Sequence, residues 1–152
     1  MKIKIMKTFS IMTCACLFIF SGAFCQDFKK LDPDAVNNHS KETAGKFATV
    51  FLTDLKNGSV YQFKDEATGD LKKALTEDMQ KQSYQNLKDQ FGDFESLNYT
   101  ETWIYSKDTT LRFFRFKADF NKSNGKLEVR VVLNGEGKIA GIWITPWKDT
   151  IQ

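Results

Sequence analysis

The feature that most restricts the fold of this chain is a change of hydrophobic period near Phe94. After that point apolar and polar side chains alternate in four runs, which cover Leu97 to Tyr105, Phe114 to Phe120, Leu127 to Leu133 and Ala140 to Ile144. Such alternation is typical of strands that bury one face. The connections are short, and those at Asn124-Gly125 and Asn134 to Gly137 are typical of hairpins. We therefore predict a four-stranded antiparallel meander.

The residues before Phe94 have a helical period instead. Asp32-Pro33 predicts a helix start, and apolar residues then recur at helical spacing (Ala44, Phe47, Ala48, Phe51 and Leu55) until Asn57-Gly58. We expect a short second helix over about 68–75. A third should follow Thr76 and end at Gly92, with Met79, Leu87 and Phe91 on its apolar stripe. Helices on one face of an antiparallel sheet make an α+β layer fold.

The turns also predict the pairing of the strands. A two-residue loop at Asn124-Gly125 places Phe120 opposite Val129, and the turn at Asn134 to Gly137 places Val131 opposite Ala140. The same rule at Lys107-Asp108 places Leu97 opposite Ala118, Tyr99 opposite Phe116 and Trp103 opposite Arg112. The apolar residues then share one face, as a correct register requires.

Residues 1–25 predict a signal peptide. Three lysines precede the apolar stretch Phe9 to Phe20, and Ala23 and Cys25 have the spacing that signal peptidase reads. We expect cleavage after Cys25 and export to the periplasm or out of the cell. Two alternatives are a lipoprotein cut before Cys25, which Phe24 disfavours, and an uncleaved anchor, which the polar second half of the stretch disfavours. Residues 26–33 would form an N-terminal arm, and residues 34–152 a single domain.

The composition of the remaining chain excludes several classes of function. Three of the 22 basic residues and none of the 19 acidic residues lie in the signal segment, so the exported part carries 19 of each. A neutral chain has no electrostatic attraction to nucleic acid or to an anionic membrane. All three cysteines (Cys14, Cys16 and Cys25) lie in the removed segment, and His39 stands alone in a polar stretch. We therefore expect no disulfide, no metal site and no cofactor.

Four segments resemble a secreted bacterial domain-of-unknown-function family. They are Asn57 to Tyr61, Leu71 to Thr76, Phe91 to Ser96 and Gly137 to Ile144. The family is also found fused ahead of α/β-hydrolases. The resemblance covers about residues 47–146, and it implies a nuclear-transport-factor-two-like, cystatin-like cone. The shared motifs are turn glycines and core positions, so the resemblance implies a fold and no catalytic residues.

Charged residues on the apolar sheet face indicate a candidate pocket. The predicted register brings Glu101, Trp103 and Arg112 together, beside Tyr99 and Phe114. These five residues could form the polar end of a ligand pocket at the mouth of the cone. The alternative is a salt bridge at the rim, with the Arg112 stem lying on Trp103.

The opposite sheet face carries candidate interface residues, which are Phe113, Val132, Ile139 and Trp143. An apolar patch of this kind often marks a contact surface. The resemblance also implies a homodimer through this face. Alternatively, the N-terminal arm (Asp27 to Leu31) or the tail around Trp147 covers the face.

We expect a non-catalytic exported domain that binds a small apolar ligand or a protein partner. One alternative is a purely structural module that self-associates. Another is an enzyme of the ketosteroid-isomerase or polyketide-cyclase type, with Glu101 as base and Tyr99 as proton donor. A neighbouring Arg112 would lower the pKa of Glu101, which is the wrong direction for a base that works near neutral pH.

Overall fold

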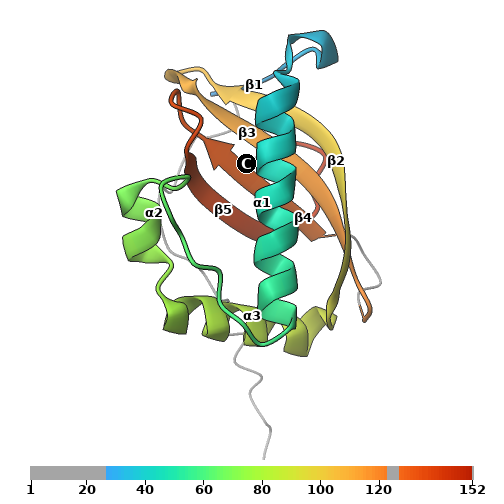
Figure 1. Ribbon diagram of the computed structural model, residues 1–152. Coiled ribbons are helices and arrows are strands. Elements are labelled where there is room, and N and C mark those ends of the chain that lie inside the picture. Colours follow the sequence, from blue (N-terminus) through green and yellow to red (C-terminus); the bar gives the residue numbers. More distant parts are fainter. Residues whose placement is uncertain (1–26, 123–126, 152) are drawn as a thin grey trace, which may run out of the picture.

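The structure is a computed structural model that describes residues 27–122 and 127–151. It is an α+β fold in which helices pack on one face of a five-stranded antiparallel sheet (Figure 1). The strands are β1 (Phe28–Lys30), β2 (Phe94–Tyr105), β3 (Asp108–Phe120), β4 (Leu127–Leu133) and β5 (Ile139–Pro146), and they lie in that order across the sheet. The predicted signal peptide (1–25) and the turn at Asn124-Gly125 lie outside the described residues. Within them, no helix is both long and apolar enough to span a membrane.

The predicted class is confirmed, but the sheet has one strand more than the predicted four. Residues 26–33, predicted as an arm, contribute β1, which pairs antiparallel with β2 through Phe28–Tyr105, Lys29–Ile104 and Lys30–Trp103. Only three residues take part, and two of them are lysines. A strand this short has no readable alternation, so only the partner strand reveals it.

The three helices follow the predicted order, α1 (Asn38–Lys56), α2 (Gly69–Ala74) and α3 (Glu77–Phe91). The predicted start at Asp32-Pro33 is a single 3-10 turn (Pro33–Ala35). The helix α1 begins only after Asn37, whose side chain accepts a hydrogen bond from the Ser40 backbone N–H. Thr68 and Thr76 cap α2 and α3 in the same way.

The predicted apolar stripe of α3 is wrong at Met79, whose side chain is 38% exposed. Gln80 is buried instead. Its side chain donates to the carbonyls of Tyr61 and Leu75 and accepts from the Tyr61 N–H. A buried amide with every bond satisfied can replace an apolar residue, and hydrophobic periodicity does not detect it.

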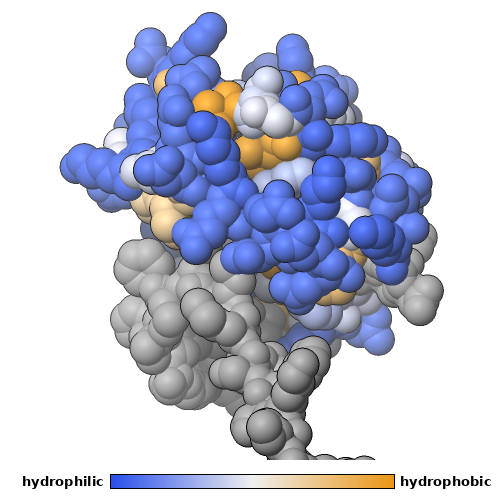
Figure 2. Space-filling model, turned by 90° about the horizontal axis from the view of Figure 1, so that it is seen from below, coloured by the Kyte–Doolittle hydropathy of each residue, from blue (hydrophilic) through white to orange (hydrophobic). Residues whose placement is uncertain are grey.

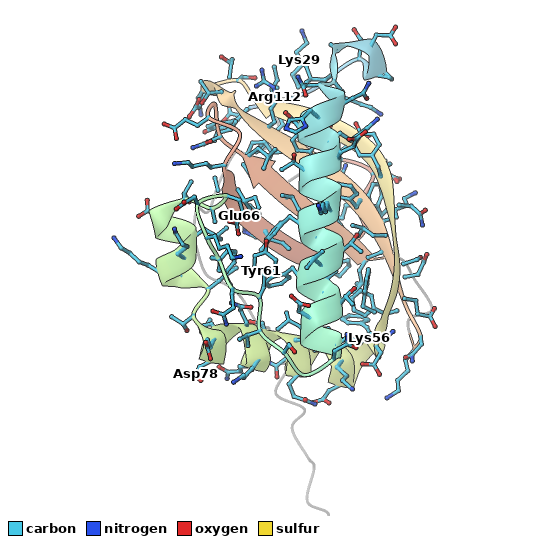
Figure 3. All side chains as sticks on the ribbon, in the orientation of Figure 1. Lys29, Lys56, Tyr61, Glu66, Asp78 and Arg112 are labelled. Carbon is cyan, nitrogen blue, oxygen red and sulfur yellow. The ribbon has the colours of Figure 1, made fainter. Side chains whose placement is uncertain are left out.

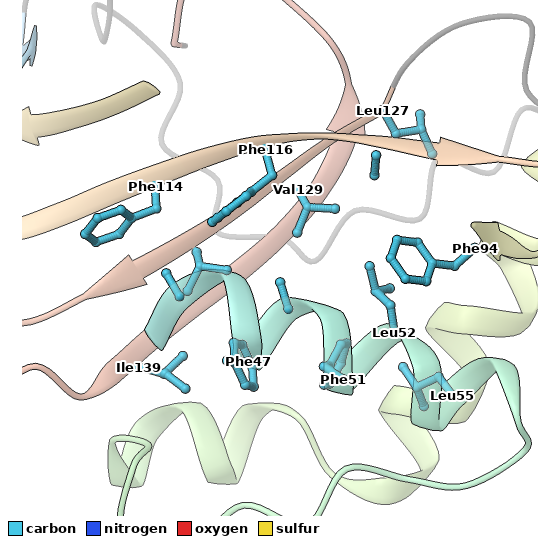
Figure 4. Packing of buried hydrophobic residues seen from close by; sticks show 14 of the residues in the cluster. Phe47, Phe51, Leu52, Leu55, Phe94, Phe114, Phe116, Leu127, Val129 and Ile139 are labelled. Atoms are coloured by element: carbon cyan, nitrogen blue, oxygen red, sulfur yellow. The ribbon is translucent and has the colours of Figure 1, made fainter. Parts of the chain in front are cut away.

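The core lies between α1 and the concave face of the sheet, which curves around this helix (Figure 1). Figure 4 shows Leu52 of α1 near Phe94, on the side of the helix where Phe116 and Val129 lie. Phe47 and Phe51 point to the other side of the helix, where their rings contact Tyr61 and Phe63, so the buried cluster continues there. Gly45 lies so close to the sheet that a Cβ there would be 3.3 Å from the Phe116 ring. At the level of Gly45, the Phe116 ring therefore fills the space between α1 and the sheet.

The predicted pairing of the last two hairpins is wrong in register, but apart from the start of β5, where Ile139 faces the core, the side chains lie on the predicted faces. Phe116, and not Phe120, lies opposite Val129, and Ile142, and not Ala140, lies opposite Val131. In both hairpins the true partner is displaced from the predicted one by an even number of residues. Because side chains alternate with a period of two, an even slip leaves the same residues facing the core. The connection between β3 and β4 is longer than the two residues that the Asn-Gly signal predicts.

Gly92, which ends α3, provides a test of this architecture. Its φ of 84° and ψ of −160° lie in a region that essentially only glycine adopts. A Cβ there would also lie 2.0 Å from the Asn121 side-chain oxygen, which binds the Asp93 N–H. We expect Gly92→Ala to lower the free energy of unfolding by about 1–3 kcal/mol, as measured by urea denaturation.

The matched control is Gly69→Ala at the start of α2, where a Cβ would meet no atom within 4 Å. We expect this change to be neutral or to stabilise the protein by up to about 1 kcal/mol. Equal effects of the two substitutions would contradict the role given to Gly92.

Candidate functional site

An irregularity in β2 decides which charged residues meet. Tyr99 lies opposite Phe116 as predicted, but Glu101 lies opposite Arg115, and the register shifts between the two pairs. A bulge of this kind inserts one extra residue and reverses the alternation of side chains beyond it. Glu101 and Trp103 therefore point to the face of the sheet away from α1, which we call the outer face. The predicted opposition of Trp103 and Arg112 is wrong, because Trp103 pairs with Phe113.

The five predicted pocket residues are divided between the two faces. Tyr99, Phe114 and Arg112 lie on the side of α1, and Glu101 and Trp103 lie on the outer face. Phe114 is a core residue, and the Tyr99 hydroxyl shares a hydrogen bond of 2.8 Å with Thr102. Glu101 and Arg112 form neither the predicted ion pair nor the rim salt bridge that was its alternative.

Arg112 lies beside the N-terminal end of α1 (Figure 3). Its guanidinium donates to the carbonyl oxygens of Thr109 and Leu111 in its own strand. It pairs with Ile104 on one side and with Leu133 on the other. The arginine therefore stabilises the end of the β2–β3 hairpin.

A different arginine forms the charged cluster. Arg115 is completely buried on the outer face, and its guanidinium binds the carboxylates of Glu101 and Glu128, the latter at 2.7 Å. Each carboxylate also binds a second cation, Lys30 to Glu101 and Arg130 to Glu128, both at 2.6 Å. The result is a chain of five alternating charges across four strands, which we call the charge ladder.

The C-terminal tail packs over the middle of the charge ladder. The Trp147 ring lies 4.3 Å from the Arg115 guanidinium carbon and 4.4 Å from the Lys117 ammonium, measured to the ring centroid. Arg115 also donates a hydrogen bond to the Lys148 carbonyl oxygen. Stacking on an aromatic ring favours a cation that has lost its water. The tail thus covers the part of the outer face where Arg115 lies.

The charge ladder is held in its ionised form. Burial alone would raise the pKa of Glu101, but the hydrogen bond from Lys30 and the charge of Arg115 hold that pKa below its usual value. Burial alone would lower the pKa of Arg115, but Glu128 and Glu101 raise it. A carboxylate with a lowered pKa stays charged at neutral pH and is a poor general base.

The four predicted interface residues also have different surroundings. Phe113 packs edge-on against Phe28 of β1, with ring centroids 5.0 Å apart, and Val132 is buried. Ile139 belongs to the core and not to the outer face, because the register between β4 and β5 shifts at Val132/Leu133. The tail lies on this face through Trp147, as one alternative interpretation expected, whereas the backbone of the arm forms the edge strand β1 and reaches the face through side chains such as Phe28.

Trp143 is the predicted interface residue that is exposed, with 39% of its surface accessible. Its indole lies across Gly141, where a Cβ would be only 2.2 Å from the ring. Any larger residue at position 141 would displace the indole. The indole therefore lies along its own strand and presents an apolar surface on the outer face.

Three other large apolar side chains are about equally exposed, Val50, Met79 and Tyr99, and they lie on other elements. Seen from below, the described surface is mostly hydrophilic and its hydrophobic residues form small patches (Figure 2). In residues 27–122 and 127–151, no group of three or more His, Cys, Asp or Glu residues could hold a metal ion.

No family model matches the chain, and no curated protein and no solved structure matches it either. The family resemblance given above therefore rests on the sequence motifs alone.

Sequence reasoning missed Arg115 and Glu128, and it named Trp147 only as part of a tail that could cover the outer face. The first two alternate with apolar neighbours, as solvated residues of a half-buried strand do. The available signal was the unusual number of apolar residues on the same face, which indicated that something covers it. The contact with the tail joins residues more than 30 positions apart and leaves no local pattern.

The burial of Arg115 predicts a large effect on stability. Replacing it in Arg115→Met leaves Glu101 and Glu128 buried without the cation between them, so we expect a loss of about 3–5 kcal/mol in urea denaturation. The control Arg112→Met removes hydrogen bonds to backbone only and should cost about 1 kcal/mol. The triple change Glu101→Leu/Arg115→Met/Glu128→Leu should recover most of the loss. A loss in Arg115→Met no larger than in the control would refute the buried cluster.

The lowered pKa of Glu101 predicts a dependence of stability on pH. The folded state favours the ionised carboxylate, so its contribution is complete above the usual pKa of 4.5 and is lost as pH falls through the lower folded-state value. In Glu101→Gln, the fall in the free energy of unfolding with acid should be shallower than in the unmodified protein. The exposed Glu42→Gln is the control. Parallel curves for Glu101→Gln and the unmodified protein would contradict the assignment.

Proposed function

We propose that this chain is an exported, non-catalytic domain that binds a protein partner on the outer face of its sheet, with Trp143 at the centre of the contact. The observation that carries the proposal is the exposed indole of Trp143, which lies across Gly141. Tryptophan is among the residues that most often anchor protein interfaces. A side chain that already packs against its own strand has less conformational freedom to lose on binding.

Three features of the molecule support a partner protein over a small apolar ligand. The candidate pocket residues do not share a face, core side chains fill much of the space under α1, and the exposed tryptophan lies on the other side of the sheet. Trp143 lies directly opposite Arg130, at one end of the charge ladder, so a charged side chain lies next to the exposed indole.

The enzyme alternative gains no support from the two residues on which it depended. Glu101 and Tyr99 lie on opposite faces, so they cannot act on one substrate atom as base and proton donor. The lowered pKa of Glu101 also disfavours it as a base.

Export and the superfamily are part of the same proposal. The basic and apolar segments of residues 1–25 support a signal peptide that is cut after Cys25. The curvature of the sheet around α1 supports a cone of the nuclear-transport-factor-two-like, cystatin-like type (Figure 1).

Site-specific photocrosslinking tests the partner proposal. A photoreactive phenylalanine derivative is placed at position 143 in the full-length protein, and light is applied to intact cells that produce it. We expect a discrete crosslinked protein species, because a partner on this face lies against residue 143. The control places the same group at Val50 of α1, which is equally exposed at 39%.

The products from the two positions decide the result. A discrete product from position 143 that is absent from position 50 supports a partner on the outer face. The same weak, diffuse products from both positions would contradict it. A small molecule that co-purifies with the protein and stays bound to Trp143→Ala would favour the ligand alternative instead.

A further inference from the structure

The two edges of the sheet differ in how they are protected against pairing with another strand. At one edge, β1 has only three residues, and its exposed Lys29 and Lys30 oppose the approach of a further strand. At the other edge, β5 has eight residues, Ile139–Pro146, and none of them is charged. Long, neutral, apolar edges are rare in isolated sheets because they recruit other strands. The edge formed by β5 lacks that protection.

The peptide groups of β5 that point away from β4 can be identified. The N–H of Ile139 donates to the Glu66 carbonyl at 2.8 Å, and its own carbonyl accepts from the Thr68 N–H at 2.9 Å. Both groups of Ile139 therefore point to the outer edge. In a strand, the side-chain face and the direction of the peptide groups alternate together.

The side chains of Ile142 and Ile144 pack against the core, as that of Ile139 does. Ile139 and Ile142 are an odd number of residues apart, and they share a face because the register shift at the start of β5 inserts one extra residue between them. Their N–H and C=O groups therefore point to the same edge. In the described part of the chain, this edge is bridged to another segment only at Ile139, through Ala67. Among the described residues, no backbone hydrogen bond from another segment reaches the edge peptide groups of Ile142 and Ile144.

We propose that this strand is β5 of a second copy, paired antiparallel about a two-fold axis at Trp143. This inference rests on the proposed function, because it names the partner on that side of the sheet. Ile142 then lies opposite Ile144 of the second copy, and each such pair exchanges two N–H···O=C bonds. The axis relates both pairs, so the two copies bury the same surface.

The sequence of β5 favours a second copy over an unrelated strand. The central residues Ile142-Trp143-Ile144 read the same in both directions, so a two-fold axis at Trp143 places like residues opposite each other. At the axis, Trp143 meets Trp143 of the second copy as a pair without backbone hydrogen bonds, with Cα atoms about 4.5 Å apart. No like charges oppose each other, because the strand has none. Pro146 has no N–H and ends the ladder.

Charge substitutions at the axis test this arrangement. The full-length protein is recovered from the exported fraction, and its mass is measured by light scattering and sedimentation over a range of concentrations. Trp143→Glu and Trp143→Lys should each raise the dissociation constant of the dimer about tenfold or more, because like charges then meet across the axis. An equimolar mixture of the two variants should restore the dimer, since opposite charges meet in the mixed pair. Val50→Glu is the control and should not change the mass.

Amide hydrogen exchange of the unmodified protein provides a second test that needs no variant. The N–H groups of Ile142 and Ile144 should exchange more slowly at concentrations where the protein is dimeric than where it is monomeric. A dimer formed face to face would leave their exchange rates independent of concentration, and so would a monomer. Either of these two results would overturn the edge pairing, even if a variant fails to fold.

The outcomes separate this inference from the proposed function. If the N–H groups of Ile142 and Ile144 are protected in a concentration-dependent way and the mixture of charge variants restores the dimer, both the edge pairing and the proposed function are supported. A protein that stays monomeric at about 100 μM, far above a typical dissociation constant for a stable interface, overturns the inference. If position 143 then crosslinks to a different protein, the proposed function stands. If it crosslinks to nothing, both fail.

Discussion

The burial of Arg115 is the constraint on which the outer side of this molecule depends. A guanidinium cannot lose its water without carboxylates to replace it. Glu128 is placed for this by the regular pairing of β4 with β3, but Glu101 reaches Arg115 only because β2 contains a bulge after Tyr99. The bulge in β2 therefore has an electrostatic consequence, because it turns the carboxylate of Glu101 from the core side to the side of Arg115. A buried ion cluster of this kind specifies an arrangement more than it adds stability.

The same cluster connects the two ends of the described chain. Lys30 of β1 binds Glu101, and the tail lies over Arg115 through Trp147 and the Lys148 carbonyl. Residues near the start and the end of the domain are thus ordered by one group of charges in the middle of the sheet. The outer face is consequently occupied at its centre, and its exposed apolar feature, Trp143, lies toward the β5 edge. The concave face has the opposite character, because α1 and aromatic residues fill it (Figure 4).

The fold was largely predictable from local patterns, and the site was not. Hydrophobic periods located all three helices and four of the five strands, and Gly92 marked the end of α3 as expected. Errors in register at the last two turns left most side chains on the predicted face, because the slips were even, but the further shift at Val132/Leu133 moved Ile139 from the predicted outer face to the core. The predicted pocket was wrong because the pairing of β2 with β3 shifts by one residue at the bulge in β2. This shift places Glu101 and Trp103 on the other face of the sheet. A bulge without glycine leaves no clear mark in the sequence, and one residue is enough to invert every side chain beyond it.

By itself, the sequence determined the class of the fold, the order of its elements and most residues of the core, because these depend on periodicity and on turn and cap residues that act locally. The tertiary structure alone decided that Arg115 would be buried, that Arg112 would bind only backbone, and that the arm would become β1. Each of these depends on which distant segment supplies the partner of a charge or a peptide group. The free energy of a buried charge is set by its neighbours in space, and a strand edge is free or covered according to what lies beside it.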